Sequence, residues 1–223
     1  MVRRVDPAHR TLGRVFHEEI ATPLDLDFYI GTPSDVPVER IAPLEPPGLW
    51  TRLTGMPFGL TVAAMNPRSV LHRSLVVNPG TGFYLDPDLV VVRDLEVPSG
   101  GGIGSARAIS RAYGAFADGG GELGLRAETL AELSAPATPS RHGFHDECFG
   151  GPAKFSLGFM QPCESIAFGH PGAFGAPGAG GSMGYADPEF GIGYGYVTNR
   201  MGTDITGDPR DVALRAALDG ILA

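Results

Sequence analysis

Lysine is nearly absent from this chain: Lys154 is the only one among 223 residues, and arginine carries almost all the positive charge. The formal net charge is −8 at pH 7, and no run of lysines or arginines offsets it. Binding to a phosphate backbone needs clustered basic side chains. We therefore expect no nucleic-acid partner.

Cysteine and long apolar runs are also scarce. The two cysteines, Cys148 and Cys163, lie in different predicted elements and do not form a disulfide framework. No apolar run approaches the roughly 18 residues that a membrane helix needs. The basic N-terminus, MVRRVDPAHR, lacks the apolar segment of a secretory signal. These absences predict a cytoplasmic protein without a membrane partner.

Glycine and proline, in contrast, are abundant, with 33 and 20 residues. They cluster between periodic segments, and hydrophobic residues make up 43% of the chain. This composition favours a loop-rich folded domain over disorder. No linker divides the chain, so we expect one domain over residues 1–223, with helices and loops in 1–150 and antiparallel strands plus a C-terminal helix in 151–223.

Helical periodicity is clearest in four segments. Residues 11–20 place apolar side chains on one face with Thr11 as N-cap, and Ser105 occupies the cap position of a second helix that ends at the glycines 119–121. Residues 128–133 suggest a short helix. Asp208 and Pro209 begin the last one. We expect its apolar face to lie against a sheet, and that face comprises Val212, Ala216, Ala217 and Ile221.

From residue 154 the pattern changes to short apolar or aromatic runs separated by turn residues, which is typical of antiparallel strands. These runs are FSLGFM, SIAFG, GGSMGYA and GIGYGYV. Asp187-Pro188 is a turn signal between the last two. The sequence therefore predicts three or four antiparallel strands backed by the terminal helix.

The segment from Ser165 to Met201 is the most informative about function, because its dense glycines let a backbone run close to a ligand. His170-Pro171-Gly172 opens it, and two candidate strands follow. This segment resembles the last strands of the β-lactamase-like serine hydrolases, particularly the esterase branch. The segment from Leu95 to the Ser105 helix and the one from residue 11 are similar to that family as well. The resemblance implies an α+β, β-lactamase/transpeptidase-like fold.

In that family an edge strand with Lys-Thr-Gly or His-x-Gly borders the active-site cleft. His170-Pro171-Gly172 matches it best, and the resemblance implies that the N–H of Ala173 donates into an oxyanion hole. A near-repeat, Pro177-Gly178-Ala179, offers a second register with Gly178 as the corresponding glycine. A glycine-rich turn without a ligand role is the structural alternative.

The family's nucleophile motifs are missing from this chain. The serine of Ser-x-x-Lys is activated by its lysine and by the tyrosine of a Tyr-x-Asn motif. The residue three before Lys154 is Gly151, and no tyrosine here is followed two residues later by asparagine. In the family both motifs precede the helix with which this chain begins, so the missing portion is contiguous. We expect a truncated serine hydrolase, inactive alone, whose complete relatives hydrolyse small-molecule esters or amides through an acyl-serine.

The alternative is a non-catalytic binding or interaction module derived from the same fold. In either case strands missing from the N-terminal side would leave a bare sheet edge, and an unpaired edge invites self-association. No catalytic residue and no cofactor is assigned to this chain.

Two further motifs have simpler explanations. Gly180 to Gly184 matches G-x-S-x-G around Ser182, but a nucleophile elbow needs a helix after the serine, and a hairpin is predicted there. The cluster from His142 to Cys148 lacks a second ligand pair with zinc spacing and is interpreted as a solvated loop. We therefore predict no metal site.

Overall fold

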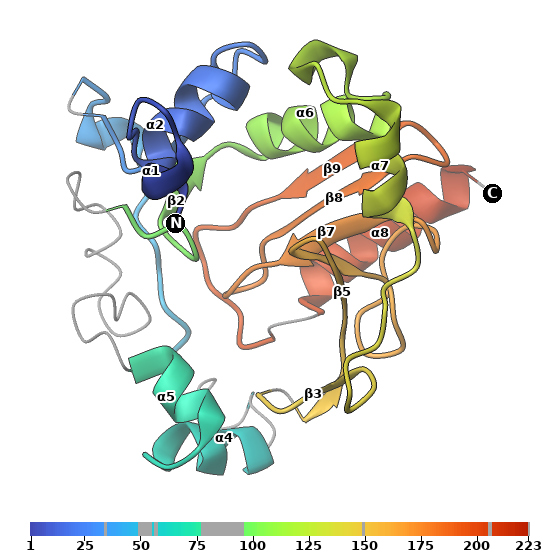
Figure 1. The fold of residues 1–223 in the computed structure, drawn as a ribbon. Helices are drawn as coiled ribbons and strands as arrows, with labels where there is room; N and C mark the ends of the chain where they lie inside the picture. The colour runs from blue at the N-terminus through green and yellow to red at the C-terminus, as the bar shows by residue number, and fades with distance from the viewer. Residues whose placement is uncertain are drawn as a thin grey trace.

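The computed structural model describes residues 1–33, 35–48, 55, 58–76, 96–148, 150–204 and 207–222. A five-stranded antiparallel sheet in the C-terminal half, in the order β5-β6-β7-β8-β9, organises this part of the chain. Its strands are β5 (Lys154–Ser156), β6 (Phe159–Gln161), β7 (Phe174–Pro177), β8 (Met183–Asp187) and β9 (Ile192–Tyr196). Helices and loops from the N-terminal half lie beside and above it (Figure 1). The architecture is α+β.

The part of the chain before β5 contains mainly helices and two small strand pairs. Its helices are α1 (Val2–Val5), α2 (Leu12–Phe16), the π-helix His17–Ala21, α4 (Phe58–Met65), α5 (Val70–Val76), α6 (Ala106–Ala117) and α7 (Ala127–Ser134), with 3₁₀ turns at Val38–Arg40 and Gly121–Leu123. The strand pairs are β1 (Phe28–Ile30) with β2 (Gly102–Gly104), and β3 (His145–Asp146) with β4 (Gly151–Pro152). The last helix is α8 (Pro209–Leu222). Among the described residues, no helix has both the length and the apolar character needed to cross a membrane.

The helix caps predicted from the sequence are confirmed. The Thr11 hydroxyl accepts from the Arg14 N–H at 3.3 Å, and the Ser105 hydroxyl accepts from the Ala108 N–H at 3.1 Å. Such caps satisfy N–H groups that a helix start leaves without a partner. Gly119 and Gly120 follow α6 with φ of 83° and 67°, a left-handed conformation that favours glycine.

One predicted strand is absent, and one observed strand was not predicted. SIAFG (165–169) forms no strand; only an isolated bridge joins Ile166 to Cys163. The strand instead lies further on, at β7, where the sequence indicated a glycine-rich loop. Gly175 explains the difference, because a Cβ there would lie 2.1 Å from the Gly184 carbonyl oxygen on β8. This close strand contact requires glycine, and β-propensity does not detect it.

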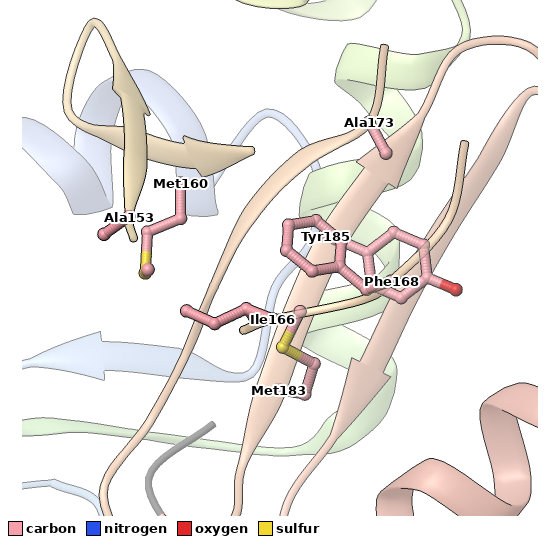
Figure 2. Packing of buried hydrophobic residues seen from close by; sticks show 7 residues of the cluster. All are labelled: Ala153, Met160, Ile166, Phe168, Ala173, Met183 and Tyr185. Atoms are coloured by element: carbon pink, nitrogen blue, oxygen red, sulfur yellow. The ribbon is translucent and has the colours of Figure 1, made fainter. Parts of the chain in front are cut away.

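The sheet buries side chains on both faces. Toward α6 and α7, Phe174 and Ala186 pack with Ala117 and Leu133. The other face carries the cluster of Figure 2, in which Met183 and Tyr185 project from the same side of β8 and the Phe168 ring approaches Tyr185 at 5.3 Å between centroids. Alternate residues of a strand point to opposite faces, so β8 contributes to both cores.

Helix α6 packs directly on the glycine face of β9. A Cβ on Gly193 would lie 2.1 Å from both the Gly114 nitrogen and the Ser110 oxygen, and one on Gly195 would lie 2.5 Å from the Ala106 oxygen. The tyrosines that alternate with these glycines point the other way, where the Tyr194 hydroxyl meets α8. Helices α6 and α8 therefore cover opposite faces of the sheet.

Helix α8 does not lie against the sheet through its predicted apolar face. Val212 is 42% exposed and Ile221 81%, whereas Asp211 and Arg215 are buried at 3% and 7%. Ala216 and Ala217 are exposed too. The polar pair faces inward because its partners are there: Asp211 accepts from the Tyr194 hydroxyl at 2.8 Å and from Arg215 Nε at 2.8 Å. Arg215 also donates to the Ala167 carbonyl.

Candidate functional site

The glycine-rich segment forms a hairpin, with β7 and β8 joined by a turn at residues 178–182. The Gly178 N–H donates to the Ser182 carbonyl at 2.7 Å, and the Gly181 N–H donates to the Gly178 carbonyl at 3.1 Å. Gly180 and Gly181 have φ of 84° and 103°, which side chains rarely adopt. A Cβ on Gly178 would lie 2.2 Å from Ser182 Oγ. Glycine is therefore required for the shape of this turn.

Neighbouring loops hold the turn in place. The Gly202 N–H donates to the Gly180 carbonyl at 2.8 Å, and a Cβ on Gly181 would lie 2.4 Å from Asp208 Oδ2. Asp208 is 4% exposed and pairs with Arg210 at 2.7 Å. The hydrogen bond from Arg210 lowers the pKa of this carboxyl, which therefore stays ionised beneath the turn.

The two candidate registers of the His-x-Gly motif lie at opposite ends of β7. His170, Gly172 and Ala173 precede the strand, whereas Gly178 follows it at the turn. Ala173 is fully buried, and its N–H donates to the His170 carbonyl at 2.8 Å. That N–H is already used within the protein, so in this structure Ala173 does not offer a donor to a ligand.

The second register differs at the residue that follows its glycine, Gly178. Ala179, the residue after it, is half-buried, and its N–H makes no hydrogen bond with any described residue. Pro177 and Ala176 end the strand before it, and Ala176 is exposed. The turn end of β7 therefore leaves one backbone N–H, that of Ala179, without a partner among the described residues.

His170 has a structural partner instead. Its Nδ1 lies 2.9 Å from Asp187 Oδ2, and the same oxygen accepts from the His170 N–H at 3.0 Å. The ring also packs on Phe190, with centroids 4.3 Å apart. The hydrogen bond to Asp187 raises the pKa of His170, and burial opposes it. This contact joins the start of the β7 segment to the end of β8.

The other sequence motifs can be placed as well. Ser182 is followed by strand β8 and not by a helix, so the nucleophile-elbow geometry is absent at this position. His145 lies in the short β3–β4 hairpin, and Cys148 donates its N–H to Asp146. Within the described ranges, no group of three or more metal-ligating side chains is close enough to hold an ion.

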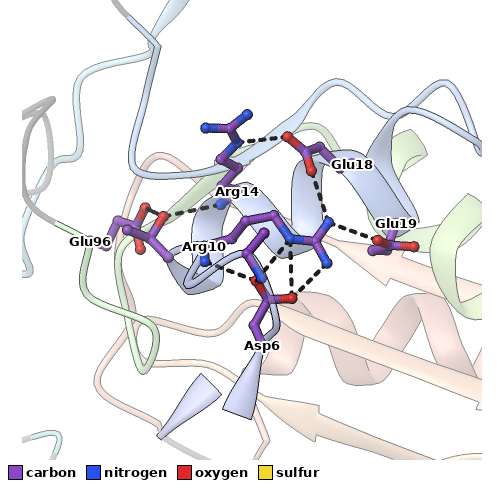
Figure 3. A network of polar contacts seen from close by, with 8 residues as sticks. Asp6, Arg10, Arg14, Glu18, Glu19 and Glu96 are labelled. Carbon is purple, nitrogen blue, oxygen red and sulfur yellow. Dashed lines mark hydrogen bonds and ion pairs between the residues drawn. The ribbon is translucent and has the colours of Figure 1, made fainter. Parts of the chain in front are cut away.

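A polar network that the sequence did not reveal fixes the start of α2 (Figure 3). Glu96, far along the chain, accepts from the Thr11 hydroxyl at 2.5 Å and from the Gly13 N–H at 3.1 Å. Arg10 pairs with Asp6 at 2.7 Å and with Glu18 at 2.8 Å. A hollow of about 190 Å³ lies beside this helix, and its lining contains no residue of the glycine-rich segment. We therefore assign this network a structural role.

Comparisons with known proteins agree with the fold. The family model described as Beta-lactamase matches residues 1–218. An esterase/beta-lactamase, LipL, of Mycobacterium tuberculosis is 31% identical over 200 residues, which are 84% of this chain and 42% of LipL. The fold is that of a β-lactamase/transpeptidase-like domain. The chain belongs to the beta-lactamase family.

Solved structures show the same relationship. A family VIII carboxylesterase is 32% identical with a TM-score of 0.71, and the match covers 96% of this chain and 53% of that one. A penicillin-binding protein homologue from Caulobacter crescentus is 31% identical with a TM-score of 0.73, covering 97% and 54%. EstA from Arthrobacter nitroguajacolicus is 26% identical with a TM-score of 0.72, covering 100% and 57%. The chain thus spans about half the length of these relatives.

Proposed function

We propose that this chain is the part of a serine hydrolase of the β-lactamase/carboxylesterase type that forms one wall of the active site. The turn at the end of β7 carries this proposal, because the half-buried Ala179 in it has a backbone N–H without a partner among the described residues, beside a buried, ionised Asp208. The relatives named as esterases and as a β-lactamase support an ester or amide substrate. No cofactor is needed for acyl transfer by an activated serine.

The oxyanion donor in this proposal is the N–H of Ala179, which follows Gly178. A donor stabilises the negative charge that develops on the substrate carbonyl oxygen only if it is not already engaged. Ala173 donates to His170, whereas the Ala179 N–H has no partner among the described residues. The register with Gly178 is therefore preferred over the one with Gly172.

The same proposal places the reacting serine outside these 223 residues. Neither Ser-x-x-Lys nor Tyr-x-Asn occurs here, and Lys154 lies in β5 with its ammonium near the Phe144 ring. A serine without a neighbouring base is a weak nucleophile. The chain should bind and orient substrate on one side while chemistry depends on groups from another segment.

The test is hydrolysis of p-nitrophenyl esters and of nitrocefin by the purified 223-residue protein. We expect no turnover above that of buffer. Robust hydrolysis that a serine-directed inhibitor abolishes would overturn the assignment of the nucleophile. A non-catalytic binding module also predicts no turnover, but it additionally predicts that this chain alone is monodisperse and unfolds cooperatively.

A further inference from the structure

Ala176 occupies the position where the cleft strand of the family carries a basic side chain. That strand has the motif Lys-Thr-Gly or His-x-Gly, and the register with Gly178 as its glycine reads Ala176-Pro177-Gly178 in this chain. Ala176 is exposed near the end of β7 and pairs with Gly184 of β8. A methyl group therefore replaces the basic side chain of the motif.

The lysine and the histidine that could supply a positive charge lie elsewhere. Lys154, the only lysine of the chain, is in β5, and its ammonium lies 5.7 Å from the centre of the Phe144 ring. Strand β6 separates β5 from β7 in the sheet. His170 precedes β7 at the end opposite to the turn, and its Nδ1 lies 2.9 Å from Asp187 Oδ2. Neither residue takes the place of a basic side chain at position 176.

The side chain of Ala176 lies where the covered face of the sheet opens to solvent. Alternate residues of a strand share a face, so Ala176 is on the same side as Phe174. Phe174 is 1% exposed and packs with Leu133 of α7, whereas Ala176 is exposed. A longer side chain at position 176 can therefore extend beside the turn at 178–182 without displacing the core.

The charged groups beside this turn balance one another. A Cβ on Gly181 would lie 2.4 Å from Asp208 Oδ2, so this carboxylate lies against the turn. Arg210 is paired with it, at 2.8 Å from Nε to Oδ1 and 2.7 Å from Nη2 to Oδ2. Arg200 lies opposite Glu45 in an isolated β-bridge. These groups together provide no surplus positive charge, in a chain whose net charge is −8.

This arrangement favours ligands without a negative charge. An anion that leaves water without gaining a partner is strongly disfavoured, and the net negative charge of the chain repels it as well. An uncharged ester or amide needs only a hydrogen-bond donor for its carbonyl oxygen, and the N–H of Ala179 is available for that role.

We propose that Ala176 is a specificity-determining residue, through which the site accepts uncharged esters and amides and excludes those that carry a carboxylate beside the scissile carbonyl. This proposal rests on the proposed function, because it takes the Ala179 N–H as the donor.

The test uses two ligands that differ only in this charge, benzylpenicillin and its methyl ester, in NMR titrations of the ¹⁵N-labelled 223-residue protein. We expect the methyl ester to shift the amide signals of residues 176 and 178–182. Benzylpenicillin should bind at least about tenfold more weakly, because its carboxylate finds no cation. This comparison is made on the wild type and requires no variant to fold.

Replacing Ala176→Lys should raise the affinity for benzylpenicillin by at least about tenfold and change that for the methyl ester by less than about twofold. The gain should shrink at high salt, because salt screens an exposed ion pair. The matched control is Ala213→Lys, which adds the same charge at an exposed position of α8. It should alter neither affinity.

Equal binding of the two ligands by the wild type would overturn the proposal. An Ala176→Lys protein that gains no affinity for benzylpenicillin would overturn it too, and so would an equal gain from Ala213→Lys, which would assign the effect to net charge. Binding at the turn without discrimination contradicts the specificity alone and leaves the proposed function in place. If neither ligand shifts residues 176–182 in either protein, the proposed function fails together with this proposal.

Discussion

The His170 imidazole depends on one buried carboxylate. Asp187 is 3% exposed and accepts from both the ring and the backbone of His170. Its hydrogen bond raises the pKa of His170, and the nearby charges of Glu189 and Asp219 act in the same direction. A histidine held in its charged form stabilises the folded state most when it is protonated.

The stability contributed by His170 should decrease as the pH rises. The folded-state pKa exceeds the unfolded value of about 6.5, so this contribution to the free energy of unfolding is fully present below that pH. It is lost as the pH rises through the folded pKa. Urea unfolding of wild type and Asp187→Asn at pH 5 and pH 9 checks this. We expect the wild type to lose more stability over that range, and an equal loss in both would contradict the assignment. NMR titration of His170 should show its pKa falling in Asp187→Asn.

Removing the Tyr194 hydroxyl should lower the free energy of unfolding, whereas removing the Tyr196 hydroxyl should not. Tyr194 donates to the buried Asp211, and the Tyr196 hydroxyl makes no hydrogen bond within the described part of the chain. Tyr194→Phe removes one donor from a buried carboxylate and should cost about 1–3 kcal/mol of unfolding free energy. Tyr196→Phe is the matched control on the same strand. Chemical denaturation measures both, and equal effects would refute the role given to Tyr194.

At the scale of elements, the contact between α6 and β9 leaves no room for a side chain at Gly193. Gly193→Ala should destabilise the protein by about 1–3 kcal/mol or more, because its Cβ would overlap α6 backbone atoms. The control Gly220→Ala lies in α8, where a Cβ would meet nothing within 4 Å. It should leave stability unchanged or raise it by up to about 1 kcal/mol. Thermal unfolding of both variants decides the matter, and a harmless Gly193→Ala would show that α6 sits further from the sheet.

The sequence predicted those elements whose signals are local. The Thr11 and Ser105 caps, the turn at Asp187-Pro188 and the helix beginning at Pro209 were all predicted correctly. The orientation of α8 was not, because apolar periodicity gives no information that Asp211 and Arg215 find partners in Tyr194 and Ala167. Strand β7 was missed for a similar reason: only the neighbouring Gly184 explains why Gly175 belongs in a strand.

The candidate site stays a prediction. The sequence pointed to the glycine-rich segment as the informative region and left two registers open. The hydrogen bond from Ala173 to His170 favours the second register, and it depends on a turn that glycine content alone does not specify. The Glu96 contact with the start of α2 joins residues more than 80 positions apart. Such a contact cannot be inferred from local sequence.

At the scale of the whole molecule, three observations support the proposal that this chain is one part of a catalytic unit. The family model matches nearly the entire chain, the relatives are about twice as long, and the β9 edge and α8 face lack partners among the described residues. In the proposed function, the glycine hairpin supplies a backbone donor and the activated nucleophile comes from another segment. We therefore expect the reacting serine to belong to a different segment.

The most direct measurement is the intact mass of the purified 223-residue protein after treatment with a fluorophosphonate, which labels activated serines. We expect no adduct, because no serine here has the lysine and tyrosine that would activate it. A stoichiometric adduct on any serine, with Ser182 at the β7–β8 turn as the first to examine, would contradict it.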